Sequence, residues 1–175
     1  MSIRAANLED AKSIATIHVN AWQFTYKGLI PQSYLDNLSI PKREQVWCNI
    51  LSDSKTCTKT HTIVQEINDI LVGFANFGHT RDRDKDFDVT AEITSIYLDP
   101  QYWRRGLGKA LFEFILRDIK KLGFTEVTLW VLNSNQRACS FYEKMGLKPD
   151  GTTKIDIRGN FELKEIRYST RLIST

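Results

Sequence analysis

The segment from Tyr97 to Phe112 constrains the fold more than any other part of the sequence. It reads YLDPQYWRRGLGKALF, so a β-strand ends at Asp99-Pro100, a short basic turn follows, and an amphipathic helix begins. Gly106 and Gly108 stand at the turn, where a backbone has to bend tightly and approach a neighbouring group closely.

The same turn has the features of an anion-binding site. Arg104, Arg105 and Lys109 surround it, and the first N–H groups of a helix are unpaired and lie at the positive end of the helix dipole. A diphosphate would use all of these features at once. Glycines at a helix start can also serve packing alone, and the spacing matches neither a P-loop nor a complete dinucleotide fingerprint. The turn therefore indicates a phosphate-bearing cofactor, with the packing alternative still open.

Hydrophobic periodicity divides the rest of the chain into short strands and helices, without repeats or linkers. Asn7 is a plausible N-cap for a first helix that ends before Gly28, and Asn68-Asp69 has the residues of a hairpin turn. Further helices are predicted at 32–38, 42–51, 108–121 and 135–145, and strands at 2–6, 60–66, 71–78, 89–98, 126–132, 148–158 and 163–171. This order predicts a mixed α/β domain.

Composition bounds the class of protein. The chain has 175 residues, of which 42% are hydrophobic and 26% charged, as in a soluble domain with a sizeable core. A net charge of +3 is too small to indicate a nucleic-acid partner but suits an anionic ligand. The N-terminus lacks a signal-peptide core, and no apolar run reaches the length of a membrane span. Cys48, Cys57 and Cys139 have no metal-ligand spacing and are interpreted as reduced thiols. We expect a cytoplasmic protein with no membrane partner and no metal.

A second segment, Leu129–Lys148, reads LWVLNSNQRACSFYEKMGLK. Together with the turn, it makes the chain resemble the GNAT superfamily of acetyl-CoA-dependent N-acetyltransferases. The family signature Gln/Arg-x-x-Gly-x-Gly/Ala is matched by Gly106 and Gly108, while Trp103 replaces the usual Gln or Arg. The second segment resembles the family's strand–Asn-x-x-Ala–helix–Tyr-Glu-Lys-x-Gly-Phe element, with Leu147 in place of the aromatic residue.

The resemblance covers essentially the whole chain and implies one N-acetyltransferase domain over residues 1–175. The implied fold is a mixed, mostly antiparallel central sheet flanked by helices, with splayed strands at the cofactor site. The implied co-substrate is acetyl-CoA. The residues expected to bind it are Ile96, Tyr97, Leu98, Arg104, Arg105, Gly106, Leu107, Gly108, Lys109 and Asn135.

Acetyl transfer needs a proton acceptor for the amine, a donor to the developing oxyanion, and an acid near the sulfur. The resemblance assigns the acid to Tyr142, whose structural alternative is an aromatic packing residue. Glu92 is the candidate base, because a carboxylate among apolar neighbours should have a raised pKa; its alternative is a strand-end carboxylate that faces solvent or pairs with a basic residue. His18 and His61 are fallback bases.

Other residues have two readings. Asn135 could cap its helix, hydrogen bond the pantetheine arm of the cofactor, or do both, and Asn133 is a weaker second candidate. Four aromatic residues of the early helical region also have two interpretations. They form part of the core, or they form a wall of the acceptor site, as the resemblance implies: Trp22, Phe24, Tyr26 and Tyr34. The charged run 81–88 is expected to be a solvated loop.

The sequence therefore favours acetyl transfer to a primary amine of a small molecule by direct attack in a ternary complex. A protein N-terminal or lysine acetyltransferase is the second reading, and a non-catalytic acyl-CoA-binding or regulatory domain is the third. An open groove between the early helices and the last hairpin would favour a peptide acceptor, and a closed pocket a small molecule. A homodimer is compatible with the sequence.

Overall fold

The computed structural model describes residues 1–52 and 60–172, so Cys57 lies outside the described residues. The elements follow in the order β1 (Ser2–Ala5), a 3₁₀ turn (Leu8–Asp10), α1 (Ala11–Thr25), α2 (Gln32–Asp36), α3 (Ile40–Ser52), β2 (His61–Ile67), β3 (Ile70–His79), β4 (Thr90–Leu98), a second 3₁₀ turn (Pro100–Tyr102), α4 (Leu107–Lys121), β5 (Glu126–Leu132), α5 (Gln136–Lys144), β6 (Lys148–Arg158) and β7 (Phe161–Arg171).

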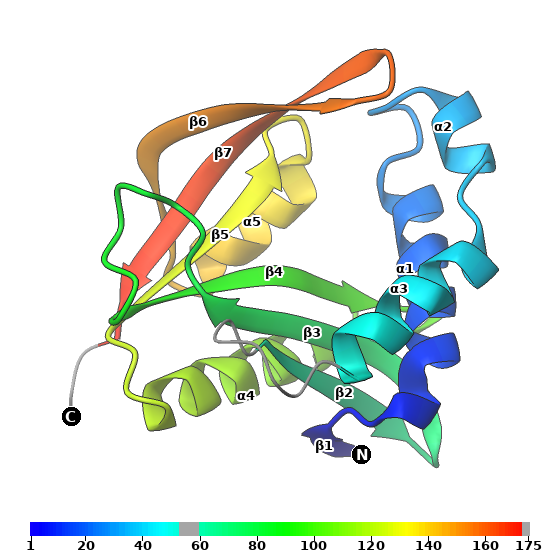
Figure 1. Ribbon diagram of the computed structural model, residues 1–175, viewed down its shortest axis with the longest axis horizontal. Coiled ribbons are helices and arrows are strands. Elements are labelled where there is room, and N and C mark those ends of the chain that lie inside the picture. The colour runs from blue at the N-terminus through cyan, green and yellow to red at the C-terminus, as the bar shows by residue number, and fades with distance from the viewer. Residues whose placement is uncertain (53–59, 173–175) are drawn as a thin grey trace.

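Seven strands form one sheet in the order β1-β2-β3-β4-β5-β7-β6 (Figure 1). The pair β4–β5 is parallel, and α4 is the crossover between these two strands. The other neighbouring strands pair antiparallel. The expectation of a mixed, mostly antiparallel sheet is confirmed.

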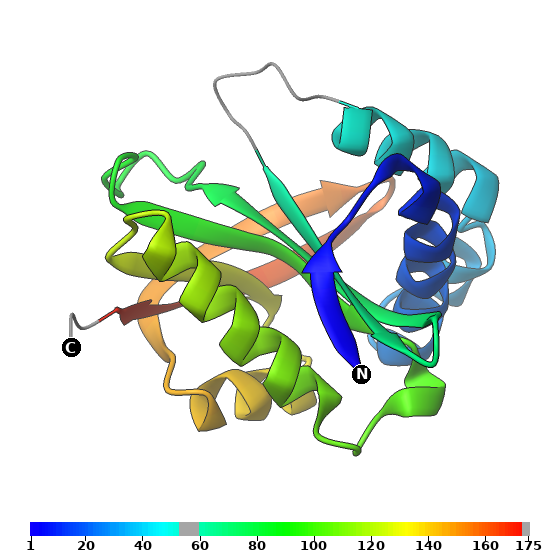
Figure 2. The ribbon, with the colours of Figure 1, turned by 90° about the horizontal axis from the view of Figure 1, so that it is seen from below.

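Helices cover both faces of the sheet. Figure 2 shows α4 and α5 on one side and α1, α2 and α3 on the other. Alternate residues of β3 serve the two layers: Phe77 packs with Phe112 of α4, whereas Phe74 packs with Ile14 of α1 and Trp47 of α3. Cys139 of α5 is buried in the α4 layer, where it packs with hydrophobic side chains.

Most element boundaries lie within two residues of the predictions. Asn7 and Asp10 form a capping box, although a 3₁₀ turn precedes the helix proper at Ala11. Asn68 and Asp69 both have positive φ, 50° and 63°, as a two-residue hairpin turn requires. None of the described helices is long and apolar enough to span a bilayer.

Strand β4 departs from regular pairing in two ways that shape the site. Its parallel pairing with β5 ends at Ile93 and Leu129, so the two strands splay beyond that point. On its other side, Ile93 and Ser95 oppose consecutive residues of β3, which makes Thr94 the extra residue of a β-bulge. The splayed strands expected at the cofactor site are present.

Candidate active site

Two cavities adjoin at the splayed part of β4. The first, here the turn cavity, has a volume of about 650 Å³ and lies against the turn 103–109 and helix α5. The second, here the hairpin cavity, has a volume of about 680 Å³ and lies between the early helices and the β6–β7 hairpin. Both are lined by Tyr26, Ile93, Thr94, Ser95, Tyr97 and Trp130.

The turn cavity brings together nearly all of the residues predicted to bind cofactor. It is lined by Ile96, Tyr97, Leu98, Arg104, Gly106, Leu107, Gly108, Lys109 and Asn135. Arg105 is the exception, because its guanidinium donates to the carbonyl of Gln101 at 3.3 Å and lies 5.2 Å from the centre of the Tyr102 ring. The role of Arg105 in cofactor binding stays a prediction.

The turn itself has the backbone of an anion site. Gly106, the N-cap of α4, has φ 78°, a left-handed conformation in which a side chain would be strained. The first helix-type hydrogen bond runs from the N–H of Ala110 to the carbonyl of Gly106, so the N–H groups of residues 107–109 precede the helical ladder. Gly108 approaches β4 closely, since an added Cβ would lie 3.4 Å from Cδ1 of Leu98.

Trp103, the residue that departs from the family pattern, braces this turn. Its indole Nε1 donates to the carbonyl of Leu98 at 3.1 Å, and the edge of its ring packs with Phe24 at 4.9 Å between centres. The guanidinium of Arg137 lies 3.9 Å from the centre of the same ring. Phe24 thus lines the turn cavity and not the hairpin cavity.

Arg137 was missed by the sequence reasoning. It lines the turn cavity on the first turn of α5, two residues after Asn135. Burial and the neighbouring charge of Arg104 lower the pKa of Arg137. Neither arginine has a carboxylate partner within the described part of the chain. Arg104 and Arg137 thus present two neighbouring positive charges to the turn cavity, a feature that would suit an anionic ligand.

Tyr142 points into the turn cavity from α5. Its ring packs against Phe112, Phe141 and Tyr168 at centre distances of 6.0, 5.4 and 6.1 Å. Burial, with smaller contributions from Tyr97 and Cys139, raises the pKa of Tyr142, so the phenol keeps its proton at neutral pH. A protonated hydroxyl facing a cavity can donate a proton or a hydrogen bond to a leaving group.

Asn135 caps α5, as one of its two predicted roles required. Its side-chain carbonyl accepts a hydrogen bond from the N–H of Ala138 at 3.2 Å, and the residue is buried. The amide NH₂ is not used by the cap and remains available toward the turn cavity. Asn133 lines neither cavity.

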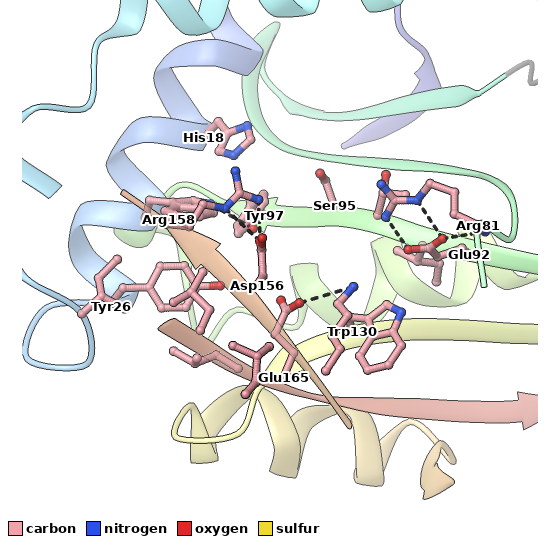
Figure 3. A pocket seen from close by; sticks show the side chains of 18 of the residues that line it. His18, Tyr26, Arg81, Glu92, Ser95, Tyr97, Trp130, Asp156, Arg158 and Glu165 are labelled. Carbon is pink, nitrogen blue, oxygen red and sulfur yellow. Dashed lines mark hydrogen bonds and ion pairs between the residues drawn. The ribbon is translucent and has the colours of Figure 1, made fainter. Parts of the chain in front are cut away.

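Glu92 lines the hairpin cavity, but its electrostatics differ from the prediction. Its carboxylate is buried and accepts hydrogen bonds from the backbone N–H of Arg81 at 3.1 Å and from Nε of Arg81 at 2.9 Å (Figure 3). Burial by itself raises the pKa of Glu92, yet the hydrogen bonds and charge of Arg81 outweigh it, and the net pKa is lowered. The expectation of a raised pKa is wrong, because the charged partner comes from a loop that the strand pattern does not reveal.

The bulge at Thr94 decides which residues share this face of β4. In an uninterrupted strand Glu92 would point the same way as Ile96 and Leu98. The extra residue reverses the alternation, so that Glu92, Ser95 and Tyr97 line the hairpin cavity, whereas Ile96 and Leu98 pack with the α4 layer.

The two fallback bases differ in position. His18 lines the hairpin cavity, where its Nδ1 accepts a hydrogen bond from the indole of Trp47 at 3.2 Å. Burial, and to a lesser extent the charge of Arg43, lowers the pKa of His18 to about 3. The ring is therefore neutral, with its proton on Nε2. His61 packs against Phe77 and lines neither cavity.

The charged run 81–88 is not simply a solvated loop. Arg81 and Asp82 line the hairpin cavity. Asp82 accepts a hydrogen bond from the indole of Trp130 at 3.1 Å and one from Arg167 at the same distance. Arg167 on β7 is 2% exposed and also binds Asp84 and Asp150. This buried arginine fastens the loop to the sheet and thereby fixes one wall of the cavity.

Three of the early aromatic residues line the hairpin cavity on the side of the early helices. Trp22, Tyr26 and Tyr34 all line it, and the indole of Trp22 donates to the hydroxyl of Tyr97 at 3.0 Å. Tyr34 of α2 meets Phe161 of β7 edge-on at 5.0 Å between ring centres. The early helices and the last hairpin are thus in direct contact.

Comparison with known proteins agrees with this architecture. A sequence model of the Acetyltransferase (GNAT) family matches residues 22–147. An uncharacterized N-acetyltransferase of Bacillus subtilis, YuaI, is 31% identical over 170 residues, 95% of this chain and 90% of that protein. The spermidine N(1)-acetyltransferase of Thermoplasma acidophilum is 26% identical over 157 residues, 89% of this chain and 93% of that protein.

A solved structure shares the fold. The PaiA N-acetyltransferase of Thermoplasma acidophilum, in complex with coenzyme A, superposes with a TM-score of 0.76 at 23% identity, covering 98% of this chain and all of that one. The family match, the relative from Bacillus and the seven-stranded sheet with splayed central strands lead to one conclusion. This chain belongs to the GNAT family of acetyltransferases.

Proposed function

We propose that the protein transfers an acetyl group from acetyl-CoA to a primary amine of a small molecule, by direct attack in a ternary complex. The observation that carries the small-molecule assignment is the contact between Tyr34 and Phe161, which joins the early helices to the last hairpin at the hairpin cavity. A peptide acceptor would need an open groove there. The name of the spermidine-acetylating relative also supports a small amine.

The turn cavity fits the co-substrate. Arg104, Arg137 and Lys109 supply positive charge beside the N–H groups that begin α4, as a pyrophosphate requires. Beyond Ile93 the edge of β4 has no partner strand on the β5 side, so backbone groups of residues 94–98 can hydrogen bond a pantetheine arm. The NH₂ of Asn135 lies on the same cavity.

Acetyl transfer would take place where the two cavities adjoin. An N–H on the free edge of β4 would stabilise the oxyanion as the amine nitrogen bonds to the acetyl carbon. Tyr142 would give its proton to the sulfur as the carbon–sulfur bond breaks, so that CoA leaves as the thiol. The amide product keeps the acetyl group, and the phenolate recovers a proton from the amine nitrogen through water.

Glu92 would act on the amine side through water. With a lowered pKa it stays ionised at neutral pH, which favours holding an ammonium group or a water molecule over storing a proton. The amine would lose its first proton along such water to the solvent. Arg81, which covers the carboxylate, would fix its orientation.

Two experiments test the proposal. Isothermal titration calorimetry with acetyl-CoA should give micromolar to millimolar binding, and no binding at millimolar concentration would remove the cofactor assignment. A screen for free CoA release should then show turnover with small amines and little with peptides that have free N-termini or lysines. Preference for peptides would favour the protein acetyltransferase reading, and binding without any turnover would favour the non-catalytic domain.

A further inference from the structure

The charges that line the hairpin cavity are balanced by ion pairs, with one exception. Glu92 pairs with Arg81, Glu165 with Lys154 at 3.4 Å, and Asp156 with Arg158 at 2.8 Å. Asp82 pairs with Arg167 at 3.1 Å. Every carboxylate on the cavity wall therefore already has a cation.

Arg43 is the exception. It lines the cavity and is half-buried, and its side chain has no ion pair or hydrogen bond within residues 1–52 and 60–172. A partly buried cation without a partner is costly unless a ligand supplies the negative charge. Among the described residues of the turn cavity, Arg104 and Arg137 likewise lack a carboxylate partner, and they lie where phosphate is expected.

The position of Arg43 in α3 directs its side chain toward the end of the cavity where His18 and Tyr97 lie. It stands one turn before Trp47, so both side chains leave the same face of the helix. Trp47 is buried and donates to His18 of α1, which shows that this face of α3 packs on α1. The charge of Arg43 contributes to the pKa values of both His18 and Tyr97.

His18 adds a second donor at this end. Because Nδ1 accepts from Trp47, the neutral imidazole carries its proton on Nε2. Its ring stacks on Tyr97 at 5.0 Å between centres. Figure 3 shows His18 and Tyr97 toward one end of the cavity and the Glu92–Arg81 pair toward the other. Apolar side chains of Ile30, Leu132 and Leu163 line the space between the early helices and the hairpin.

We infer that the acceptor carries a carboxylate as well as the reacting amine, and that Arg43, with the Nε2–H of His18, binds this carboxylate. The inference rests on the proposed function and narrows its substrate class to amino acids and other aminocarboxylates with an apolar body. A polyamine would need unpaired carboxylates, and the described cavity wall offers none.

The test uses acceptors that differ only in this group. CoA release is measured with three acids, 4-aminobutanoate, 6-aminohexanoate and leucine, and with the primary amide of each acid. Each acid and its amide are compared at equal concentrations of free amine. Spermidine is the polyamine in the panel. We expect at least one acid to have a kcat/KM roughly tenfold or more above its amide, since a charge-assisted pair stabilises binding by that order.

Two variants of neighbouring residues assign the effect. Arg43→Gln should raise KM for the preferred acid roughly 10- to 100-fold and leave that for its amide unchanged. Lys42→Gln removes the same charge from the exposed neighbour on α3 and should change neither value. Because no described residue pairs with Arg43, the acetyl-CoA affinity of Arg43→Gln should equal that of the wild type, and its unfolding midpoint should be equal or higher, since a partly buried unpaired charge is removed.

The outcomes separate the inference from the proposed function. Equal turnover of acids and amides, or a preference for spermidine, overturns the carboxylate site while leaving an amine acetyltransferase. An acid preference that persists in Arg43→Gln also overturns the assignment to this residue. If acetyl-CoA binds but no amine in the panel is acetylated, the proposed function fails and the inference falls with it.

Discussion

The guanidinium of Arg137 lies 3.9 Å from the centre of the Trp103 ring, on the wall of the turn cavity. A tryptophan at position 103 carries no positive charge, but its ring holds the guanidinium of Arg137 by a cation–π contact at the wall of the turn cavity. Where the family pattern has a polar side chain, this chain has the aromatic ring of Trp103, which packs against the guanidinium of Arg137.

Arg137→Gln should weaken CoA binding roughly tenfold, because one charge-assisted contact to phosphate is lost. Trp103→Leu, which keeps Arg137 but removes its platform, should have a smaller effect in the same direction. Calorimetric titration with CoA measures both. Lys144→Gln, a charge change of equal size at the far end of α5, is the control, and an equal loss of affinity in that variant would attribute the effect to net charge.

Tyr142→Phe should lower kcat roughly 100-fold and change acetyl-CoA affinity little, because only the proton donor to the leaving sulfur is removed. The matched control is Tyr168→Phe. The Tyr168 hydroxyl binds Glu143 at 2.9 Å and faces neither cavity, so its loss should leave kcat unchanged. Steady-state CoA release with a verified acceptor distinguishes the two, and unchanged turnover in Tyr142→Phe would remove this residue from the mechanism.

The lowered pKa of Glu92 predicts the shape of the pH profile. Since this carboxylate is ionised at all pH values above its ordinary range, kcat/KM should rise smoothly from pH 6 to 9 as the amine loses its proton. An inflection between pH 6 and 7 that disappears in Glu92→Gln would instead indicate a base with a raised pKa. Glu92→Gln itself should lower kcat/KM roughly tenfold or more at every pH.

His18 makes stability depend on pH. Its pKa is about 3 in the folded protein and about 6.5 in an unfolded chain, so the unfolded state binds the extra proton between these values. Stability from this group is present above pH 6.5 and is lost as the pH falls toward 3. Between pH 7 and 5 the loss should be about 2 kcal/mol. Urea unfolding of wild type and His18→Gln at both pH values measures it, and equal losses would contradict the assignment.

Arg167→Met should destabilise the protein by about 3 kcal/mol or more, because it leaves the carboxylates of Asp82, Asp84 and Asp150 without their buried cation. Arg171→Met changes an exposed residue of the same strand and should alter the free energy of unfolding by no more than about 0.5 kcal/mol. Urea unfolding at pH 7 compares them. A similar small effect in both variants would show that the loop is held by other contacts.

Local signals in the sequence predict the elements and the turn well. The caps at Asn7 and Asn135 and the left-handed Asn68-Asp69 pair depend on residues close together in the chain, and the structure confirms them. The turn residues Gly106 and Gly108 likewise take the positions that their lack of a side chain indicates.

Features that depend on distant partners could not be predicted in this way. The pKa of Glu92 depends on Arg81, which reaches it across a loop, and that loop depends on Arg167, 85 residues after Asp82. The placement of Arg137 beside the turn depends on where Trp103 places its ring. No periodicity or motif encodes such contacts.

The extra residue at Thr94 also has a consequence for how this site can vary. Within the described residues its side chain hydrogen bonds to Asn76 alone, so other residues could stand at this position with modest effect. Deleting the position would remove the bulge and leave Glu92, Ser95 and Tyr97 on one face of a regular strand, because each would then stand two residues from the next. The site thus tolerates either four residues between Glu92 and Tyr97 with a bulge or three without one, because both arrangements keep the two side chains on the same face.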